Sequence, residues 1–176
     1  MSVSPVLEGS RVKLVPFEES HLTQDYVDWL NDVSLMRYSE QRHRKHSLQS
    51  CAAFVAGFEN GPNLLWAIEA ADQDGMHIGN VTANIDPNNG IADIGLLIGA
   101  ANSSGRGYGL AAWSAVLEYL RGRSDLRKVT GGCMASNQAM VQIMQRAGMQ
   151  PDGLRKDHFI INDTLVDVLY HAVWMG

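Results

Sequence analysis

Cysteine is scarce in this sequence, and long apolar runs are missing altogether. The two cysteines, Cys51 and Cys133, stand far apart and lack the paired spacing of a zinc site, so we expect both to be reduced core residues rather than a disulfide. No stretch approaches about 18 consecutive apolar residues, and residues 1–8 contain no basic segment followed by an apolar run. We therefore expect no metal, no membrane span and no secretion signal, and we expect a cytoplasmic location.

A strong charge of either sign is also missing. The chain carries 14 Lys and Arg against 19 Asp and Glu, which gives a formal net charge of −5. This balance argues against nucleic acid as a partner, because nucleic-acid-binding proteins concentrate positive charge. The 176 residues are 45% hydrophobic and 19% charged, which is typical of one globular domain with its own core.

The first half of the chain alternates between strand and helix patterns. Residues 11–15 alternate apolar and polar side chains, which predicts a strand. Ser20 precedes one helical stripe of apolar residues, and Ser47 precedes a second. Clusters of Asp, Asn and Gly then separate three β-rich runs, which predict an antiparallel meander over residues 64–70, 76–84 and 91–98.

The second half of the chain predicts two more helices and three more strands. One helix is expected to begin at Ser136, as its N-cap, and to end at Ala147, with Gly148 just past its end. Asn162 and Asp163 are expected to form the turn of a final hairpin. The other predicted elements are a helix over residues 110–120, a strand over 128–134, and the hairpin strands within 149–161 and 166–174.

A glycine-rich segment, Ser104-Gly105-Arg106-Gly107-Tyr108-Gly109, lies between the third β-rich run and the helix that follows it. Its glycines allow a tight turn and a close approach to a ligand, and the first N–H groups of the helix would point at an anion. A Walker loop needs Gly-Lys-Ser/Thr, and a dinucleotide fingerprint needs G-x-G-x-x-G with a later acidic residue; neither pattern is present. The loop alone is equally compatible with a simple turn.

Two motifs together resemble a known family. The glycine loop opens one helix, and Asn137 precedes Arg146-Ala147-Gly148-Met149 in the next, in an element order similar to the GNAT superfamily of acetyl-CoA-dependent N-acetyltransferases. The strongest resemblance is to the branch of ribosomal-protein alanine acetyltransferases. It covers residues 7–176 as a single domain. It implies an α+β fold, with a central, largely antiparallel mixed sheet of about six to seven strands flanked by about four helices.

The resemblance also implies where acetyl-CoA binds. In similar enzymes the strand before the loop separates from its neighbour and pairs with the pantetheine arm, while one of its N–H groups polarises the thioester carbonyl. The pyrophosphate sits on the N–H groups of the loop, aided by Arg106 unless that side chain is merely solvated, and Asn137 bonds the pantetheine or the thioester end. The residues expected to bind the cofactor are Leu96, Leu97, Ile98, Ser104, Gly105, Arg106, Gly107, Tyr108, Gly109 and Asn137.

An acceptor ammonium must lose a proton before it attacks the thioester, so a base or a water chain is needed. Asp93 is the first candidate: similar enzymes place a carboxylate on this strand, and its apolar surroundings would raise its pKa, although the other face of the pleat would expose it. His158 and Asp157 are alternatives. The sequence departs from the family at two positions. Met144 stands where many members carry a tyrosine that protonates the departing CoA thiolate, and Ser104 stands where a basic residue or glutamine is frequent.

A less specific resemblance concerns the acceptor. Segments within residues 26–47 are similar to the N-terminal region of bacterial acetyltransferases that modify amino sugars on nucleotide carriers. The basic cluster at residues 42–46 suits a nucleotide diphosphate and equally suits a solvated loop. Trp29, Tyr38 and Trp66 suit stacking on a sugar or a base, and equally suit the core. We favour an amino-sugar acceptor.

Other functions stay open at this point. The ribosomal-protein branch suggests a protein N-terminus or another small amine as acceptor; an acidic pocket would favour a basic peptide, and a basic pocket would favour a sugar nucleotide. Met144 also leaves room for a catalytically silent acyl-CoA-binding module. The family often forms homodimers, for which exposed final strands offer a route.

Overall fold

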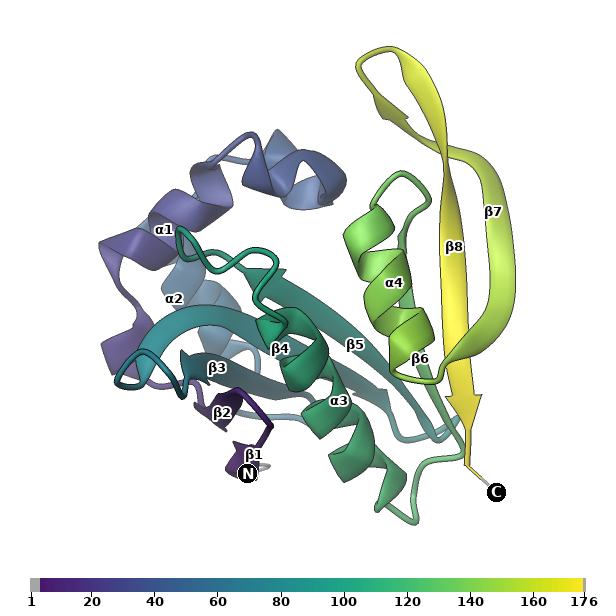
Figure 1. Cartoon of the computed structure of the whole chain (residues 1–176), viewed down its shortest axis with the longest axis horizontal. Coiled ribbons are helices and arrows are strands. Elements are labelled where there is room, and N and C mark those ends of the chain that lie inside the picture. Colours follow the sequence, from purple (N-terminus) through teal and green to yellow (C-terminus); the bar gives the residue numbers. More distant parts are fainter. Residues whose placement is uncertain (1–3, 176) are drawn as a thin grey trace.

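A mixed eight-stranded sheet forms the centre of the computed structural model, which describes residues 4–175 (Figure 1). Residues 1–3 and 176, the last of which ends the expected domain, lie outside the described residues. The strands follow the order β1-β2-β3-β4-β5-β6-β8-β7 across the sheet. Their bounds are β1 Leu7–Glu8, β2 Val12–Pro16, β3 Leu64–Ala70, β4 Met76–Asp86, β5 Ile91–Ile98, β6 Lys128–Met134, β7 Gln150–Ile161 and β8 Thr164–Trp174.

Helices cover both faces of this sheet (Figure 1). Helices α3 and α4 lie on the near face in the view, and the main core forms where buried residues of α3 meet the strands. On the other face, Tyr26 and Val27 of α1 pack with Cys51 of α2, and Leu97 of β5 packs against them. The helices are α1 Gln24–Asn31, α2 Leu48–Ala56, α3 Tyr108–Arg121 and α4 Gln138–Arg146, with short 3₁₀ helices η1 Glu19–His21, η2 Leu35–Tyr38 and η3 Glu40–His43.

Strands β5 and β6 separate partway along their length. They are parallel neighbours and pair only from Ile91 to Asp93 on β5, opposite Lys128 to Thr130 on β6. Beyond that point β6 stays paired with β8 as far as Met134, and β5 stays paired with β4 as far as Ile98. The sheet therefore divides into two halves that leave a gap beside the C-terminal end of β5.

Local turn chemistry explains several boundaries. Ser47 caps α2, and its side chain and that of Ser50 each accept from the other's backbone N–H. Asn162 and Asp163, with φ of 48° and 60°, join β7 to β8 in a two-residue hairpin loop. Gly148 ends α4 at a φ of 81°, which a side chain would strain. These three boundaries agree with the sequence prediction.

The predicted fold class is confirmed, with one more strand than expected. The extra strand is β1, whose Leu7 and Glu8 pair with Leu14 and Lys13, and two residues are too few to show a period-two pattern. The N-cap of α4 is Asn137 rather than the predicted Ser136. Both cysteines are free thiols. None of the helices between residues 4 and 175 combines the length and the apolar character needed to cross a membrane.

Candidate active site

The glycine loop leads directly into α3 and leaves the N-terminus of that helix uncapped. Gly105 and Gly107 have φ of 75° and 83°, and Gly107 is the N-cap without a side-chain cap. A Cβ at Gly105 would meet nothing within 4 Å, so this backbone faces open space. Ser104 is exposed beside it. The free N–H groups and the helix dipole make this end of α3 a site for an anion.

Tyr108 anchors the loop rather than facing the ligand side. Its ring is 1% exposed, its hydroxyl donates to Asp72 Oδ1, and Gln73 Nε2 donates to that hydroxyl at 2.7 Å. Because the hydroxyl of Tyr108 is engaged in these hydrogen bonds, only the backbone N–H of Tyr108, in the first turn of α3, is left to contact a phosphate. The turn between β3 and β4 therefore holds the loop in place through Tyr108.

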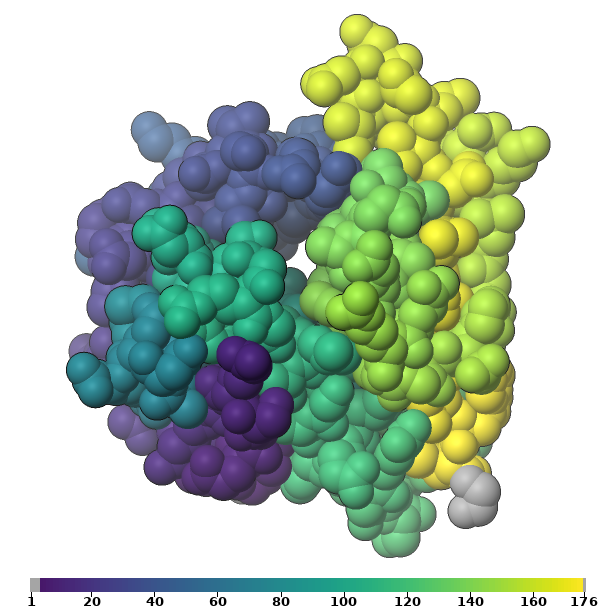
Figure 2. All heavy atoms as spheres, viewed as in Figure 1, coloured from purple at the N-terminus to yellow at the C-terminus, as the bar shows by residue number. Residues whose placement is uncertain are grey.

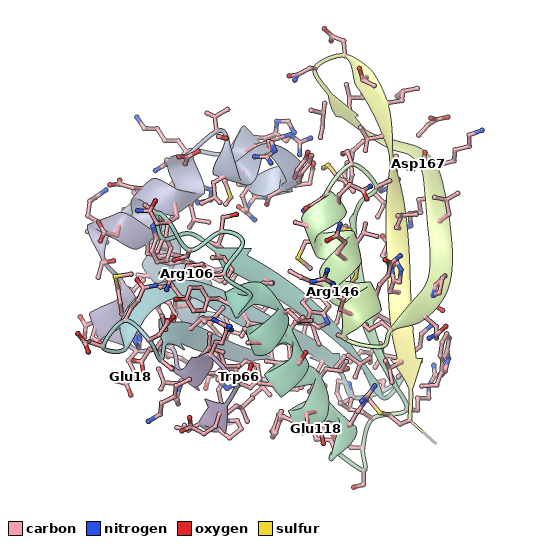
Figure 3. All side chains as sticks on the ribbon, viewed as in Figure 1. Glu18, Trp66, Arg106, Glu118, Arg146 and Asp167 are labelled. Atoms are coloured by element: carbon pink, nitrogen blue, oxygen red, sulfur yellow. The ribbon has the colours of Figure 1, made fainter. Side chains whose placement is uncertain are left out.

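Two arginines flank the loop. Arg106 lies ahead of α3 (Figure 3) and pairs with Asp72 through Nη2 and Oδ2 at 3.0 Å. The hydrogen bond from Tyr108 lowers the pKa of the Asp72 carboxyl, and the charges of Arg106 and Arg11 add to this effect. The Cδ of Arg11 lies 3.7 Å from where a Cβ of Gly107 would stand. Arg11 was not singled out from the sequence, because nothing local relates the start of β2 to a loop about 90 residues later.

The gap between β5 and β6 opens into a cavity of about 400 Å³, which we call the central cavity. Figure 2 shows the molecule hollowed between the segment around η3, the loop before α3, and α4. Leu96 and Leu97 line the cavity from β5, and Cys133 and Asn137 line it from the other half of the sheet. Ile98 and Gly109 lie close together under α3, where a Cβ on Gly109 would come within 3.7 Å of Ile98 Cγ1.

Asn137 lines the central cavity, and one end of its side-chain amide is free there. Its Oδ1 caps α4 by accepting from the N–H of Met140 at 3.3 Å. Its Nδ2 makes no hydrogen bond with residues 4–175. The amide is therefore oriented by the helix while its N–H groups are available to a ligand carbonyl.

Asp93 lines a smaller cavity of about 260 Å³, which we call the base cavity. The base cavity adjoins the central cavity, and Tyr38, Gly132 and Cys133 line both. Thr130 Oγ1 donates to Asp93 Oδ2 at 2.7 Å, and burial raises the pKa of the carboxyl above its usual value while that hydrogen bond opposes the rise. The carboxylate therefore stands beside the gap in the sheet with a pKa shifted toward that of a useful base.

The other two predicted bases do not share a cavity with Asp93. Asp157 occupies an irregularity of β7 at a φ of 50°, where its N–H donates to Asp167 Oδ1 at 2.8 Å. His158 is exposed, and its ring packs edge-on against Phe159. Phe159 lines the base cavity, whereas neither His158 nor Asp157 does.

Met144 cannot replace the missing tyrosine. Its side chain is 0% exposed and packs with Trp113 against Gly131 in the core. A thioether has no proton to donate at any position. Met140, one turn earlier in α4, lines the central cavity and offers no acid either.

Neutral polar groups lie on the opposite side of the central cavity. Tyr26, Asn80 and Thr82 line it, and none of the residues lining it is charged. His77 Nε2 lies 2.9 Å from the Gly79 carbonyl and 2.8 Å from Asn80 Oδ1. A nitrogen between two carbonyl oxygens must carry the hydrogen, so Asn80 Oδ1 accepts. The buried Nδ2 of Asn80 has no hydrogen-bond partner among residues 4–175 and remains a donor.

The three aromatic residues that could stack on a sugar or a base lie in different environments. Trp66 is a core residue, 0% exposed, with its Nε1 donating to the Pro5 carbonyl at 2.7 Å. Trp29 packs edge-on against the His77 ring and lies against Gly99, outside both cavities. Tyr38 alone of the three lines the central and base cavities. Alternation and helical spacing could not distinguish these positions.

The basic cluster is divided by Glu40, which the sequence analysis did not single out. Glu40 pairs with Arg42 at 2.7 Å and with His43 at 3.8 Å, and it lines the base cavity with Asp93. Arg44, Lys45 and His46 instead line a third cavity of about 210 Å³. Within residues 4–175, no group of three or more His, Cys, Asp or Glu side chains is arranged to hold a metal ion.

Comparisons with known proteins agree with this architecture. The family model for the acetyltransferase (GNAT) domain matches residues 11–150. No curated protein sequence matches the chain. Among solved structures, RimL, a ribosomal L7/L12 α-N-protein acetyltransferase in complex with coenzyme A, is 21% identical with a TM-score of 0.82, covering 99% of this chain and 98% of that one.

Two further solved structures contain other bound molecules beside the coenzyme. Spermidine N-acetyltransferase from Vibrio cholerae, with CoA and spermine, is 19% identical with a TM-score of 0.81, covering 94% of this chain and 96% of that one. The microcin C7 self-immunity acetyltransferase MccE, with acetyl-CoA and AMP, is 17% identical with a TM-score of 0.79, covering 94% and 93%. At these identities the three likenesses show the fold alone. The family model spans most of the chain, and the protein is therefore an acetyltransferase of the GNAT family.

Proposed function

We propose that the protein transfers the acetyl group of acetyl-CoA, the acyl donor of its family, to a primary amine by direct attack within a ternary complex. The observation that carries this proposal is that the two cavities adjoin at the gap in the sheet and share three lining residues. The central cavity borders the free end of β5 and Asn137, and the base cavity places Asp93 next to it. A thioester and a base can thus meet without a movement of the sheet.

The same gap in the sheet determines where acetyl-CoA binds in this proposal. The pyrophosphate lies on the N–H groups from Gly105 to Gly109 at the uncapped end of α3. The pantetheine arm lies along the separated part of β5, at Leu96 to Ile98, and the free amide of Asn137 donates to it. Arg106 reaches a phosphate by releasing Asp72, and Arg11 lies beside Gly107 for the same task.

The chemical step uses Asp93 as the base. It accepts a proton from the acceptor ammonium, and the resulting amine attacks the thioester carbonyl. A backbone N–H near Leu96 or Leu97 stabilises the oxyanion of the tetrahedral intermediate. The intermediate collapses with loss of the thiolate, and the second proton that the nitrogen loses passes through water to the thiolate. His158 and Asp157 are weaker proposals, because neither lines a cavity with Asp93.

For the acceptor we propose an amino sugar on a nucleotide carrier. Tyr26, Asn80 and Thr82 supply neutral donors and acceptors suited to sugar hydroxyls. A polyamine would favour carboxylates along its length, and the central cavity has no charged lining. The AMP bound to MccE supports an acceptor that carries a nucleotide.

A protein N-terminus is the second candidate. Glu40 and Asp93 make the base cavity acidic, which suits a cationic peptide. RimL, which has the same fold, is a ribosomal L7/L12 α-N-protein acetyltransferase. We also propose a cytoplasmic reaction, because Cys51 and Cys133 are free thiols that a reducing compartment preserves. For assembly we propose a homodimer through the free edge of β7, beside which Leu154, Ile160 and Leu165 are exposed.

Two-substrate kinetics tests the proposed mechanism. Thiol release from acetyl-CoA is measured while the concentrations of acetyl-CoA and of a nucleoside-diphosphate-linked amino sugar are varied. Intersecting double-reciprocal lines are expected for a ternary complex. Parallel lines would indicate a covalent acetyl-enzyme and would contradict direct attack.

A further inference from the structure

The third cavity, about 210 Å³ in volume, joins the acceptor side of the central cavity. Tyr26, Leu30, Gln41 and Phe54 line both cavities, so the two cavities adjoin. A volume of about 210 Å³ is smaller than the roughly 300–1,000 Å³ of a whole small-molecule site, so the third cavity fits part of a ligand. That part would be attached to whatever occupies the central cavity.

The lining of the third cavity is cationic. Arg44, Lys45 and His46 line it, and no Asp or Glu does. Neither Arg44 nor Lys45 belongs to any of the ion pairs found in the described part of the chain, in contrast to Arg42 and His43, which Glu40 holds. Two cations outside these ion pairs, beside a cavity without Asp or Glu in its lining, give the third cavity a positive potential.

The loop that carries these cations is fixed at both ends. The Arg44 N–H donates to the Gln41 carbonyl at 3.0 Å. Asn31 of α1 holds His46 with two hydrogen bonds, accepting from its N–H at 2.8 Å and donating to its carbonyl at 3.0 Å. Ser47 then begins α2 with its capping box. The cations are thus mounted on a preorganised backbone, which lowers the entropic cost of binding.

An aromatic ring stands at the junction of the two cavities. Phe54 lines both and is 47% exposed, which is unusual for so large an apolar side chain. Its ring and that of Phe58 form an edge-to-face pair with a centroid distance of 5.1 Å. An exposed aromatic ring at this junction suits a planar base stacked on it.

We infer that the third cavity is a subsite for the diphosphate of a nucleotide, with Arg44 and Lys45 on the phosphate oxygens and Phe54 against the base. This inference rests on the proposed function, because it assigns the carrier of the acceptor sugar to a second compartment of the same site. The sugar amine then points through the central cavity toward Asp93.

Calorimetric titration with uridine diphosphate, without acetyl-CoA or any amine, tests the subsite independently of turnover. We compare the unchanged protein with the double variant Arg44→Gln, Lys45→Gln. The matched control is Lys13→Gln, Arg121→Gln, which removes the same charge from β2 and the end of α3. We expect the unchanged protein and the control to bind uridine diphosphate. We expect Arg44→Gln, Lys45→Gln to bind it at least about tenfold more weakly, because two charge-assisted contacts are lost.

A second variant separates base stacking from charge. Phe54→Ala is expected to weaken binding of uridine diphosphate about fivefold or more, and to leave binding of inorganic pyrophosphate unchanged. No binding of uridine diphosphate at millimolar concentration, or equal binding by both double variants, would overturn the inference. Uridine diphosphate binding without acetyl transfer to any amine would contradict the proposed function and leave the subsite standing.

Discussion

Replacing Asp93 by Asn removes the proposed base while preserving its surroundings. In the unchanged protein Thr130 Oγ1 donates to the Asp93 carboxylate at 2.7 Å. Asparagine has the same shape, and its Oδ1 can still accept this hydrogen bond. The cavity and the strand pairing of Asp93 with Asn84 and Thr130 need not change. Any loss of rate therefore reports the missing base. Removal of a positioned general base lowers kcat by about 10²–10⁴-fold, equivalent to about 3–5.5 kcal/mol in the barrier.

The pH dependence gives the prediction a second readout. Burial raises the pKa of Asp93, so the acid limb of kcat/KM in the unchanged protein is expected above the ordinary aspartate value of about 3.9. Asp93→Asn should lack this limb.

Stability should change in the opposite direction to rate. Because the folded-state pKa of Asp93 is raised, the folded protein binds its proton more tightly than the unfolded chain does, and stability falls as pH rises through that pKa. Asp93→Asn avoids this loss, so its melting temperature at pH 7 should equal or exceed that of the unchanged protein. At low pH the two should converge.

The matched control is Asp86→Asn, in the turn of the same hairpin. Asp86 is exposed, and its hydrogen bonds with Asn89 lower its pKa, so the variant should keep full activity. Thiol release from acetyl-CoA and a thermal melt measure both effects. Full kcat at pH 7 in Asp93→Asn would refute the role of Asp93 as the base.

Three further predictions concern the loop, the thiol and the free edge of the sheet. Gly107→Ala forces a side chain to a φ of 83° and should cost about 1–2 kcal/mol in stability and raise the KM for acetyl-CoA; an unchanged melting temperature and KM would contradict this. Burial raises the pKa of Cys133 to about 11, so its alkylation at pH 7 should be slow, and acetyl-CoA should slow it further; labelling unaffected by acetyl-CoA would place the cofactor elsewhere. Light scattering should show a dimer that Ile160→Lys dissociates, and a monomeric unchanged protein would exclude the proposed β7 contact.

Features governed by short-range chemistry were readable from the sequence. The cap at Ser47, the turn at Asn162 and Asp163, and the end of α4 at Gly148 each depend on residues within a few positions. The glycine loop belongs to the same class, since its φ angles follow from its own glycines. Even there, the anchoring of Tyr108 by Asp72 was hidden, because the two residues are 36 positions apart.

Features that depend on distant partners were not readable. Alternation along β5 allows either face for Asp93, and the base cavity forms only when residues of η2, η3, β6, β7 and β8 pack around it. The separation of β5 from β6 depends on where parallel pairing stops, which no local pattern encodes. Asn80 became a candidate only when its unpartnered Nδ2 was seen.

The most direct test of the account is thiol release from acetyl-CoA by the pure protein with a panel of amines. The panel contains nucleoside-diphosphate-linked amino sugars, peptides with free N-termini, and polyamines. We predict release with the sugar nucleotides and little with the polyamines, because the central cavity lacks carboxylates and the third cavity is cationic. Protection from thermal unfolding by acetyl-CoA without release for any amine would contradict the central claim and identify a silent acyl-CoA-binding protein.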